Sequence, residues 1–444
     1  MCCPTYADDM TLLTLHKSSM RRLLDIVYDH SRKWRYEYNA QKSHILVFGP
    51  DSSQEKGLYI GGEKLQVVSS CRHLGVPLAT DTKSLQDSIY QNISKGLRSF
   101  HATLGLGSRY QPVPPLCLSK IYWSVSIPQI TYGLEILGLG PQNLSTLEST
   151  HMYVAKVIQG LPRQTSTPSV LIPLKWWPIR AFVSYKRIMF LWFILLMPMA
   201  NICKKLALVR ICRAFSNGIK TIPDGPIRLM LDACVEYDLF GLVVEYCVSG
   251  RYISKQKWKQ VVSEKINNVE KVRHFCQIMM YTKLKLLLDT NLTYPSVWIW
   301  WVFTNHHPKY VKHCKIMLRL LVGEHGLGQN VGRWHGKSTT VSVICRLCDM
   351  YVEESVAHIL FVCPFNEGQR RTLRDIIEES APDRLVTEMA AMDADTLTCF
   401  FPGGLRCNYI PEWDLLYINI CEYIYCIYRT RTQDHEVTTI DYLS

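Results

Sequence analysis

The sequence lacks a long uninterrupted apolar run. Its longest apolar stretch, Ile188 to Ala200, contains Pro198, whereas a helix needs about 20 apolar residues to cross a bilayer. We therefore expect no membrane span and predict a core helix there. The sequence also lacks a cleavable apolar segment near Met1, and its 17 cysteines are an odd, dispersed set. Such a set favours buried thiols in a reducing compartment, nuclear or cytoplasmic, over a secreted disulfide framework.

Acidic residues are fewer than basic residues in this sequence. The sequence also lacks an internal repeat. The chain has 50 Lys and Arg against 38 Asp and Glu, a formal net charge of +12. This excess favours a polyanionic partner or an anionic surface. With 444 residues, 48% of them hydrophobic and 20% charged, the chain is globular and long enough for two to four domains.

Two adjacent carboxylates stand before a strand-like run. Asp8 and Asp9 precede the apolar residues Met10 to Leu15, so the pair is either a solvated hairpin turn or a cation site. The pattern that follows predicts a helix capped by Ser18 or Ser19. Further elements are expected as a polar turn at Asn39 to Ser43, a strand at His44 to Gly49, a hairpin at Leu58 to Glu63, and a turn at His73 to Leu78.

Three motifs in this order resemble the second half of the palm of non-LTR (LINE-type) retrotransposon reverse transcriptases. In that family Tyr-Ala-Asp-Asp is followed by a helix, then by Asn-x-x-Lys-Ser leading into a strand, then by a Leu-Gly-Val turn. The matching residues are Tyr6 to Asp9, Asn39 to Ser43, and Leu74 to Val76. The resemblance implies an RNA-directed DNA polymerase whose partners are RNA and DNA and whose small-molecule substrates are dNTPs alone.

The resemblance also implies roles for single residues. Nucleotidyl transfer uses two divalent ions roughly 3.5–4 Å apart, and Mg²⁺ prefers oxygen ligands. Asp8 would be the firmer magnesium ligand and Asp9 the supporting one, while Tyr6 would pack beneath the hairpin tip at the nucleic acid. Lys42 would lie near the incoming triphosphate, where a cation stabilises the leaving group or donates a proton. A solvated turn lysine is an equal alternative.

One departure from the family concerns catalysis. The family's metal site also takes an aspartate from an earlier palm strand, and its fingers residues bind the nucleotide. Only Met1 to Thr5 precede Tyr6, so we expect this chain to be a truncated enzyme that is inactive alone. The alternative is a non-catalytic zinc-containing nucleic-acid-binding protein derived from such an element.

The central part of the sequence predicts helices. Residues 81–165 resemble a thumb, with helices at Asp87 to Phe100 and from Leu116. A thumb packs on the template and primer backbone, so phosphate contacts are expected from Lys95, Arg98, Arg109 and Lys120. Ordinary surface charge is the alternative.

Residues 166–320 predict a helical connector cut by prolines. Its basic clusters, Lys204 to Lys220 and Arg251 to Lys259 with interleaved aromatics, indicate nucleic-acid contacts or solvated helix faces.

A metal-ligand pattern lies downstream. Cys345, Cys348, His358 and Cys363 form Cys-x2-Cys-x9-His-x4-Cys, in which a knuckle and a helical turn complete a tetrahedron. Three thiolates and one imidazole select zinc, and a closed site is structural. Spacing alone leaves an alternative, two unrelated buried thiols and a core histidine, and leaves rival ligands at His325, His335, Cys314 and Cys399.

This pattern resembles the unit C-terminal to the reverse transcriptase in many LINE-type proteins, and Glu354 to Pro364 match its Glu-x3-His-x4-Cys-Pro part. The family uses this region to bind its RNA or target DNA. The expected phosphate contacts are Arg319, Arg333, Lys337 and Arg346.

The expected fold class is α+β, with a partial reverse transcriptase palm, a mostly α-helical thumb and connector, and a small zinc-binding lobe. The predicted segments are the palm part at 1–80, the thumb-like region at 81–165, the connector at 166–320, the zinc-binding region at 321–400, and a C-terminal helix and tail at 401–444. Helices are predicted at Glu367 to Glu379 and at Glu412 to Tyr428, the latter packing on the zinc lobe, before a mobile tail at Arg429 to Ser444.

Overall fold

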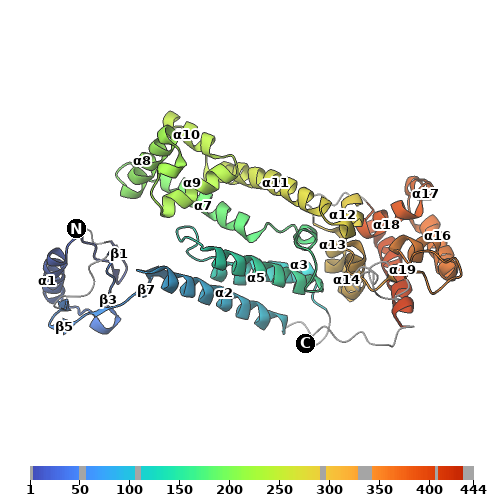
Figure 1. Cartoon of the computed structure of the whole chain (residues 1–444), viewed down its shortest axis with the longest axis horizontal. Helices are drawn as coiled ribbons and strands as arrows, with labels where there is room; N and C mark the ends of the chain where they lie inside the picture. Colours follow the sequence, from blue (N-terminus) through green and yellow to red (C-terminus); the bar gives the residue numbers. More distant parts are fainter. Residues whose placement is uncertain are drawn as a thin grey trace.

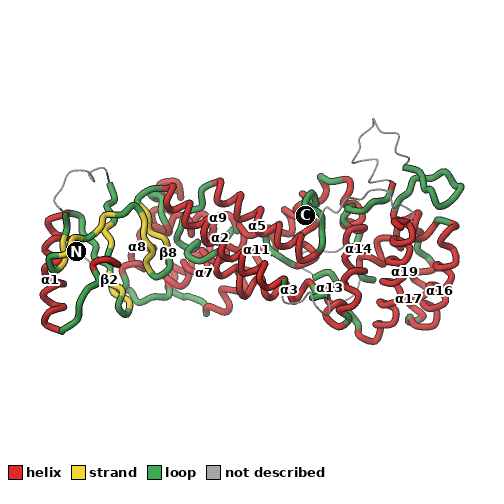
Figure 2. The backbone as a smooth tube through the Cα atoms, turned by 90° about the horizontal axis from the view of Figure 1, so that it is seen from below, coloured by secondary structure: helices red, strands yellow, loops and turns green. Residues whose placement is uncertain are grey.

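The computed structural model is elongated and mostly helical (Figure 1). It describes residues 4–49, 57–105, 112–290, 297–328, 343–405 and 409–433. Helix makes up 67% and strand 6% of the structure, which is consistent with an α+β or a helical class. The strands gather near the N-terminal end, and helices form the rest (Figure 2).

The N-terminal region contains four small two-stranded sheets and one long helix. Its strands pair as β1 (Thr5–Tyr6) with β2 (Asp9–Met10), β3 (His44–Ile45) with β6 (Gln66–Val67), β4 (Tyr59–Ile60) with β5 (Glu63–Lys64), and β7 (Ser70–His73) with β8 (Val76–Ala79). Only β3 and β6 are parallel. Helix α1 (Lys17–Trp34) covers a small core formed by Leu24, Ala40, Leu58, Ile60 and Leu65. The predicted hairpins and the Leu74-Gly75 turn are confirmed.

Three predicted boundaries in this region are wrong. The strand after Asp9 ends at Met10 rather than Leu15, because β1 offers it only a two-residue partner, and Leu15 is 96% exposed. The strand beginning at His44 likewise ends at Ile45. Helix α1 is preceded by His16, whose carbonyl accepts the Met20 N–H at 3.1 Å, so neither predicted serine is its cap.

A stack of helices follows the strands. It contains α2 (Thr82–Leu104), α3 (Pro115–Ile121), the π-helical segment η2 (Tyr122–Ser126), α4 (Ile127–Ile130), α5 (Pro141–Gln159), α6 (Thr167–Leu171) and α7 (Ile179–Leu195). Asp81 caps α2 by accepting the Ser84 N–H at 2.7 Å. At Gly96 a Cβ would lie 2.3 Å from Ile130 Cγ1, so glycine is what lets α2 approach α4. Both predicted helices of the thumb-like region are confirmed.

A separate lobe, the α8–α11 lobe, packs on the end of α7. It consists of α8 (Ile202–Asn217), α9 (Pro226–Glu236), α10 (Phe240–Ser249) and α11 (Lys255–Met279). Trp258 is fully buried and stacks on Trp192 at 4.2 Å between ring centroids. The tryptophan of the predicted aromatic and basic cluster is therefore a core residue and does not face a nucleic acid. The apolar run from Ile188 is confirmed as a core helix, ending before Pro198.

The C-terminal lobe contains α12 (Lys285–Asp289), α13 (Ile299–His306), α14 (Val311–Leu321), the π-helical turn η7 (His358–Val362), α16 (Glu367–Ser380), α17 (Asp383–Ala390), α18 (Ala394–Gly403) and α19 (Asp414–Gln433). The helix predicted from Glu367 is confirmed. The last predicted helix is α19, which begins later, at Asp414, and continues to Gln433. Residues 429–433 of the predicted tail are thus helical, and 434–444 lie outside the described residues.

The largest core crosses three of the predicted segment boundaries. It joins apolar residues between Ile89 and Val183 to others between Ile278 and Ile427, while a separate core lies between Ala181 and Ile266. Trp301 Nε1 donates to Gln159 Oε1 at 3.2 Å across this junction. The predicted boundaries at 165, 320 and 400 therefore fall inside shared packing. In the part of the chain that the structure describes, no helix is long and apolar enough to span a membrane.

Candidate metal centre

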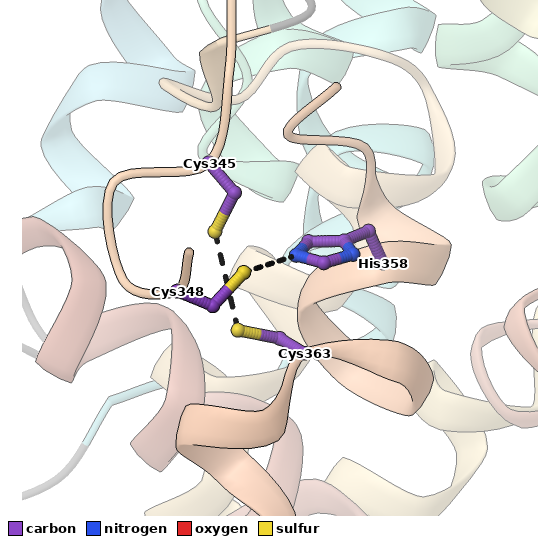
Figure 3. Close-up of side chains that lie close together, drawn as sticks. All are labelled: Cys345, Cys348, His358 and Cys363. Atoms are coloured by element: carbon purple, nitrogen blue, oxygen red, sulfur yellow. Dashed lines mark hydrogen bonds between the residues drawn. The ribbon is translucent and has the colours of Figure 1, made fainter. Parts of the chain in front are cut away.

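Cys345 and Cys348 lie in a short turn closed by backbone hydrogen bonds. The Cys345 N–H donates to the Val352 carbonyl at 2.9 Å, and the Glu354 N–H donates to the Val343 carbonyl at 2.8 Å. These bonds fix the two arms of the turn, so both thiols face the same side (Figure 3). The knuckle predicted from the two-residue cysteine spacing is present.

His358 and Cys363 are supplied by the turn η7. Its start is fixed by Ser355, whose Oγ accepts the His358 N–H at 3.1 Å, and its end by the Cys363 N–H, which donates to the His358 carbonyl at 2.6 Å. A π-helical turn closes five residues on, so positions 358 and 363 lie one above the other. Pro364 follows and ends the turn, as predicted.

The four side chains converge on one point (Figure 3). Each offers one ligand atom, and the four atoms all lie within 4.8 Å of one another. Cys345 Sγ is 3.9 Å from Cys363 Sγ, and Cys348 Sγ is 3.4 Å from His358 Nε2. A tetrahedron with Zn–S bonds of about 2.3 Å has S–S edges of about 3.8 Å. The cluster could therefore hold a metal ion, and its dimensions fit zinc.

Burial sets the protonation of these ligands. It raises the pKa of the Cys345 thiol and raises that of Cys363 to about 12, and it lowers the pKa of His358. The imidazole is therefore neutral at pH 7, which is the form that ligates metal. The thiols ionise when a divalent cation replaces their protons, so metal binding at this site releases protons.

Rival ligands do not join the cluster. Cys314, Cys399 and His325 are buried elsewhere, and Cys314 Sγ lies 3.8 Å from Cys421 Sγ. His335 is outside the described residues. Within the described ranges no second group of three or more His, Cys, Asp or Glu side chains is arranged to hold a metal.

Residues other than the four ligands fix the metal lobe, the segment from Val343 to Cys363, to its neighbours. Glu354 is fully buried and pairs with Arg431 of α19, which donates from Nη2 at 3.0 Å. The same carboxylate accepts the Gly328 N–H at 2.6 Å. Tyr423 of α19 donates its hydroxyl hydrogen to the Leu360 carbonyl in η7. The predicted packing of the C-terminal helix on this lobe is confirmed.

The two carboxylates near the N-terminus lie at an exposed hairpin. Ala7 and Asp8 form the turn between β1 and β2, with Ala7 at φ 52°. Asp8 and Asp9 are exposed, and no third His, Cys, Asp or Glu joins them in a metal-binding group among the described residues. Tyr6 is 67% exposed, because β1 and β2 are only two residues long and do not cover it. Its role at the nucleic acid stays a prediction.

The three palm-like motifs lie close to one another. Met10 Sδ accepts the Tyr38 hydroxyl at 3.8 Å, and Thr11 Oγ1 lies 3.2 Å from His73 Nε2. Met10 and Thr11 directly follow the carboxylates, and Tyr38 and His73 adjoin the second and third motifs. Asn39 accepts the Lys42 N–H at 3.1 Å and shapes the second motif, leaving the Lys42 side chain exposed.

Some of the basic side chains that were predicted to contact phosphate are exposed to solvent, and others are bound within the fold. Lys95 and Arg98 are exposed on α2, and Lys120 is exposed on α3. Arg319 instead donates through Nε and Nη2 to the Gly160 carbonyl at 2.9 and 2.6 Å, so it serves the fold. Arg346 is exposed beside Cys345. Arg109, Arg333 and Lys337 lie outside the described residues.

Comparison with known proteins adds no relative. No protein-family model matches the chain, and no curated protein matches it.

Proposed function

We propose that this chain is the palm hairpin, thumb and zinc-binding part of a LINE-type reverse transcriptase, and that on its own it binds nucleic acid without polymerising it. The convergence of Cys345, Cys348, His358 and Cys363 carries the proposal. The contacts that gather the three palm-like motifs support the same origin.

In this proposal zinc has a structural role. Four protein ligands leave no open coordination position, so the ion stabilises the lobe rather than activating water. The lobe in turn holds the exposed Arg346 next to Cys345. RNA or DNA is the partner that a net charge of +12 favours.

We expect RNA binding that weakens steeply with salt. Lys95 and Arg98 are three residues apart and exposed on one helix, so both can reach one strand of phosphates. A Lys95→Gln/Arg98→Gln variant should reduce the slope of log K against log salt by about 1.4, because each phosphate contact on a single strand contributes about 0.7. Titrations at several salt concentrations measure this slope.

The control for this experiment is Lys83→Gln, an exposed lysine of the same helix, about 18 Å along its axis from Lys95. It should leave the slope unchanged. Affinity that does not respond to salt in the unmodified protein would count against nucleic-acid binding as a whole.

Nucleotidyl transfer is the second candidate function, favoured by the exposed carboxylates at the β1–β2 turn. In the family that the hairpin resembles, the two-metal site also takes an aspartate from an earlier palm strand, and among the described residues no third acidic group joins Asp8 and Asp9 in a metal-binding group. We therefore expect no primer extension when the 444-residue chain is incubated with an RNA template, a DNA primer, dNTPs and Mg²⁺. Incorporation that disappears in Asp8→Asn would contradict this, since a contaminating polymerase would not respond to that change.

A further inference from the structure

A cleft of about 610 Å³ lies between α5 and α11. Both helices lie near the middle of the molecule (Figure 1). It is bounded by one face of α5, by α6 and the start of α7, and by the C-terminal half of α11. Ligand sites in proteins have volumes of about 300–1,000 Å³. The cleft is thus large enough for a nucleotide-sized group and lies far along the chain from the metal lobe.

Positive charge dominates the cleft. Lys156, Arg163 and Arg180 line it, against Glu148 and Glu270. Glu270 is already paired, because Arg273 donates to its Oε1 at 2.6 Å. One negative charge therefore remains against three positive ones, and an anionic ligand is favoured.

Arg180 has donor capacity to spare. Its Nε is buried, and no hydrogen-bond partner for it exists among the described residues. Burial first, and Arg180 second, lower the pKa of the neighbouring His274 to about 4, so His274 is neutral at pH 7 and does not add charge. Arg180 lines the cleft, so a phosphate bound there would lie beside its guanidinium group, whose planar array of donors matches phosphate oxygens.

Two tyrosine rings stand exposed at the cleft. Tyr153 on α5 is 36% exposed, and Tyr281, just after α11, is 45% exposed. Exposed rings beside cations are the arrangement by which proteins hold unpaired bases, since each base stacks on a ring while its phosphate meets a cation. An acidic peptide would use the cations but would leave the rings without a stacking partner.

We propose that this cleft binds an unpaired RNA or DNA strand, with bases on Tyr153 and Tyr281 and phosphates at Lys156, Arg163 and Arg180. The inference rests on the nucleic-acid binding proposed above and assigns it a place. A cleft of about 610 Å³ accommodates a short unpaired segment, whereas the bases of a duplex are paired and stacked on each other and are not available to stack on the two rings.

The test uses the zinc-loaded full chain and a fluorescein-labelled octamer of uridine, followed by fluorescence anisotropy. Tyr153→Ala and Tyr281→Ala should each weaken binding at least about fivefold, the loss expected for one stacked base. Arg180→Gln should lower the salt slope by about 0.7. Tyr59→Ala removes a ring of similar exposure in β4, and Arg384→Gln removes an exposed arginine of α17. Each should leave affinity within about twofold.

A second measurement needs no variant. Irradiation of the wild-type chain with an octamer containing 4-thiouridine should give cross-linked peptides that include Tyr153 or Tyr281. Cross-links confined to other peptides would overturn the inference, as would cleft variants that bind like the wild type. Displacement of the octamer by uridine monophosphate at equal charge concentration would overturn the inference in favour of a free nucleotide. Displacement by an oligoglutamate at equal charge concentration would overturn it in favour of an acidic peptide.

The two proposals fail in different ways. If the wild type binds no RNA or DNA of any kind, nucleic-acid binding itself fails. If it binds the octamer and the cleft variants do too, only the place assigned to binding is wrong.

Discussion

Replacement of Cys345 by serine should remove the metal and unfold the C-terminal lobe. Cys345 is 4% exposed and supplies one of four converging ligand atoms, and a serine oxygen is a far poorer ligand for this soft site. The zinc content should fall from about one ion per chain to nearly none. Structural zinc contributes about 10–16 kcal/mol of apparent binding free energy in small zinc domains, comparable with the whole stability of a domain.

The measurement pairs elemental analysis with circular dichroism of the purified chain. Cys234→Ser is the matched control, because Cys234 is fully buried but lies outside the cluster. The Cys234→Ser chain should keep its zinc. Its free energy of unfolding should fall only because a hydroxyl group is buried in the core. A wild-type chain that folds without metal, or a Cys345→Ser chain that keeps its zinc, would refute the zinc assignment.

The second large effect concerns the buried pair of Glu354 and Arg431. Both side chains are at least nine-tenths buried, and Glu354 also accepts the Gly328 N–H. Glu354→Gln leaves the Arg431 guanidinium without a counter-charge, which destabilises a protein by about 3–5 kcal/mol. Urea unfolding of the lobe, followed by the release of zinc to a chromogenic chelator, should show this loss.

Two variants make the test of this pair specific. Glu354→Gln/Arg431→Met removes both charges and should recover much of the lost stability, because no buried charge remains. Asp232→Asn breaks the exposed pair with Arg228, whose oxygen and nitrogen lie 2.9 Å apart, and should cost less than about 1 kcal/mol. If Glu354→Gln costs no more than Asp232→Asn, the pair does not secure the lobe.

Features encoded by neighbouring residues were predictable from the sequence. The metal ligands span a short segment, and their spacing predicts a knuckle and a helical turn. The hairpin at Asp8 and the Leu74-Gly75 turn were found for the same reason, since turn chemistry is local. In the structure Leu74 and Gly75 both have positive φ.

Features formed by distant residues could not be predicted in this way. Glu354 and Arg431 are 77 positions apart, and Trp301 and Gln159 are 142 apart, and periodicity carries no information about such pairs. The α5–α11 cleft was missed because it draws on four separate segments. Trp258 looked like an exposed aromatic among lysines, yet its helix buries that one face against Trp192.

The shared core has a consequence for synthesis on the ribosome. The backbone N–H of Trp298 donates to the Pro173 carbonyl at 3.0 Å, and α13 packs against α3. The packing of the earlier helices is therefore completed by residues made more than a hundred positions later. The α8–α11 lobe, with its own core, can fold during that interval, whereas α3 and α5 remain with apolar surface uncovered until the later residues are made. A premature stop before Trp298 would therefore expose these helices to aggregation as well as deleting the metal lobe.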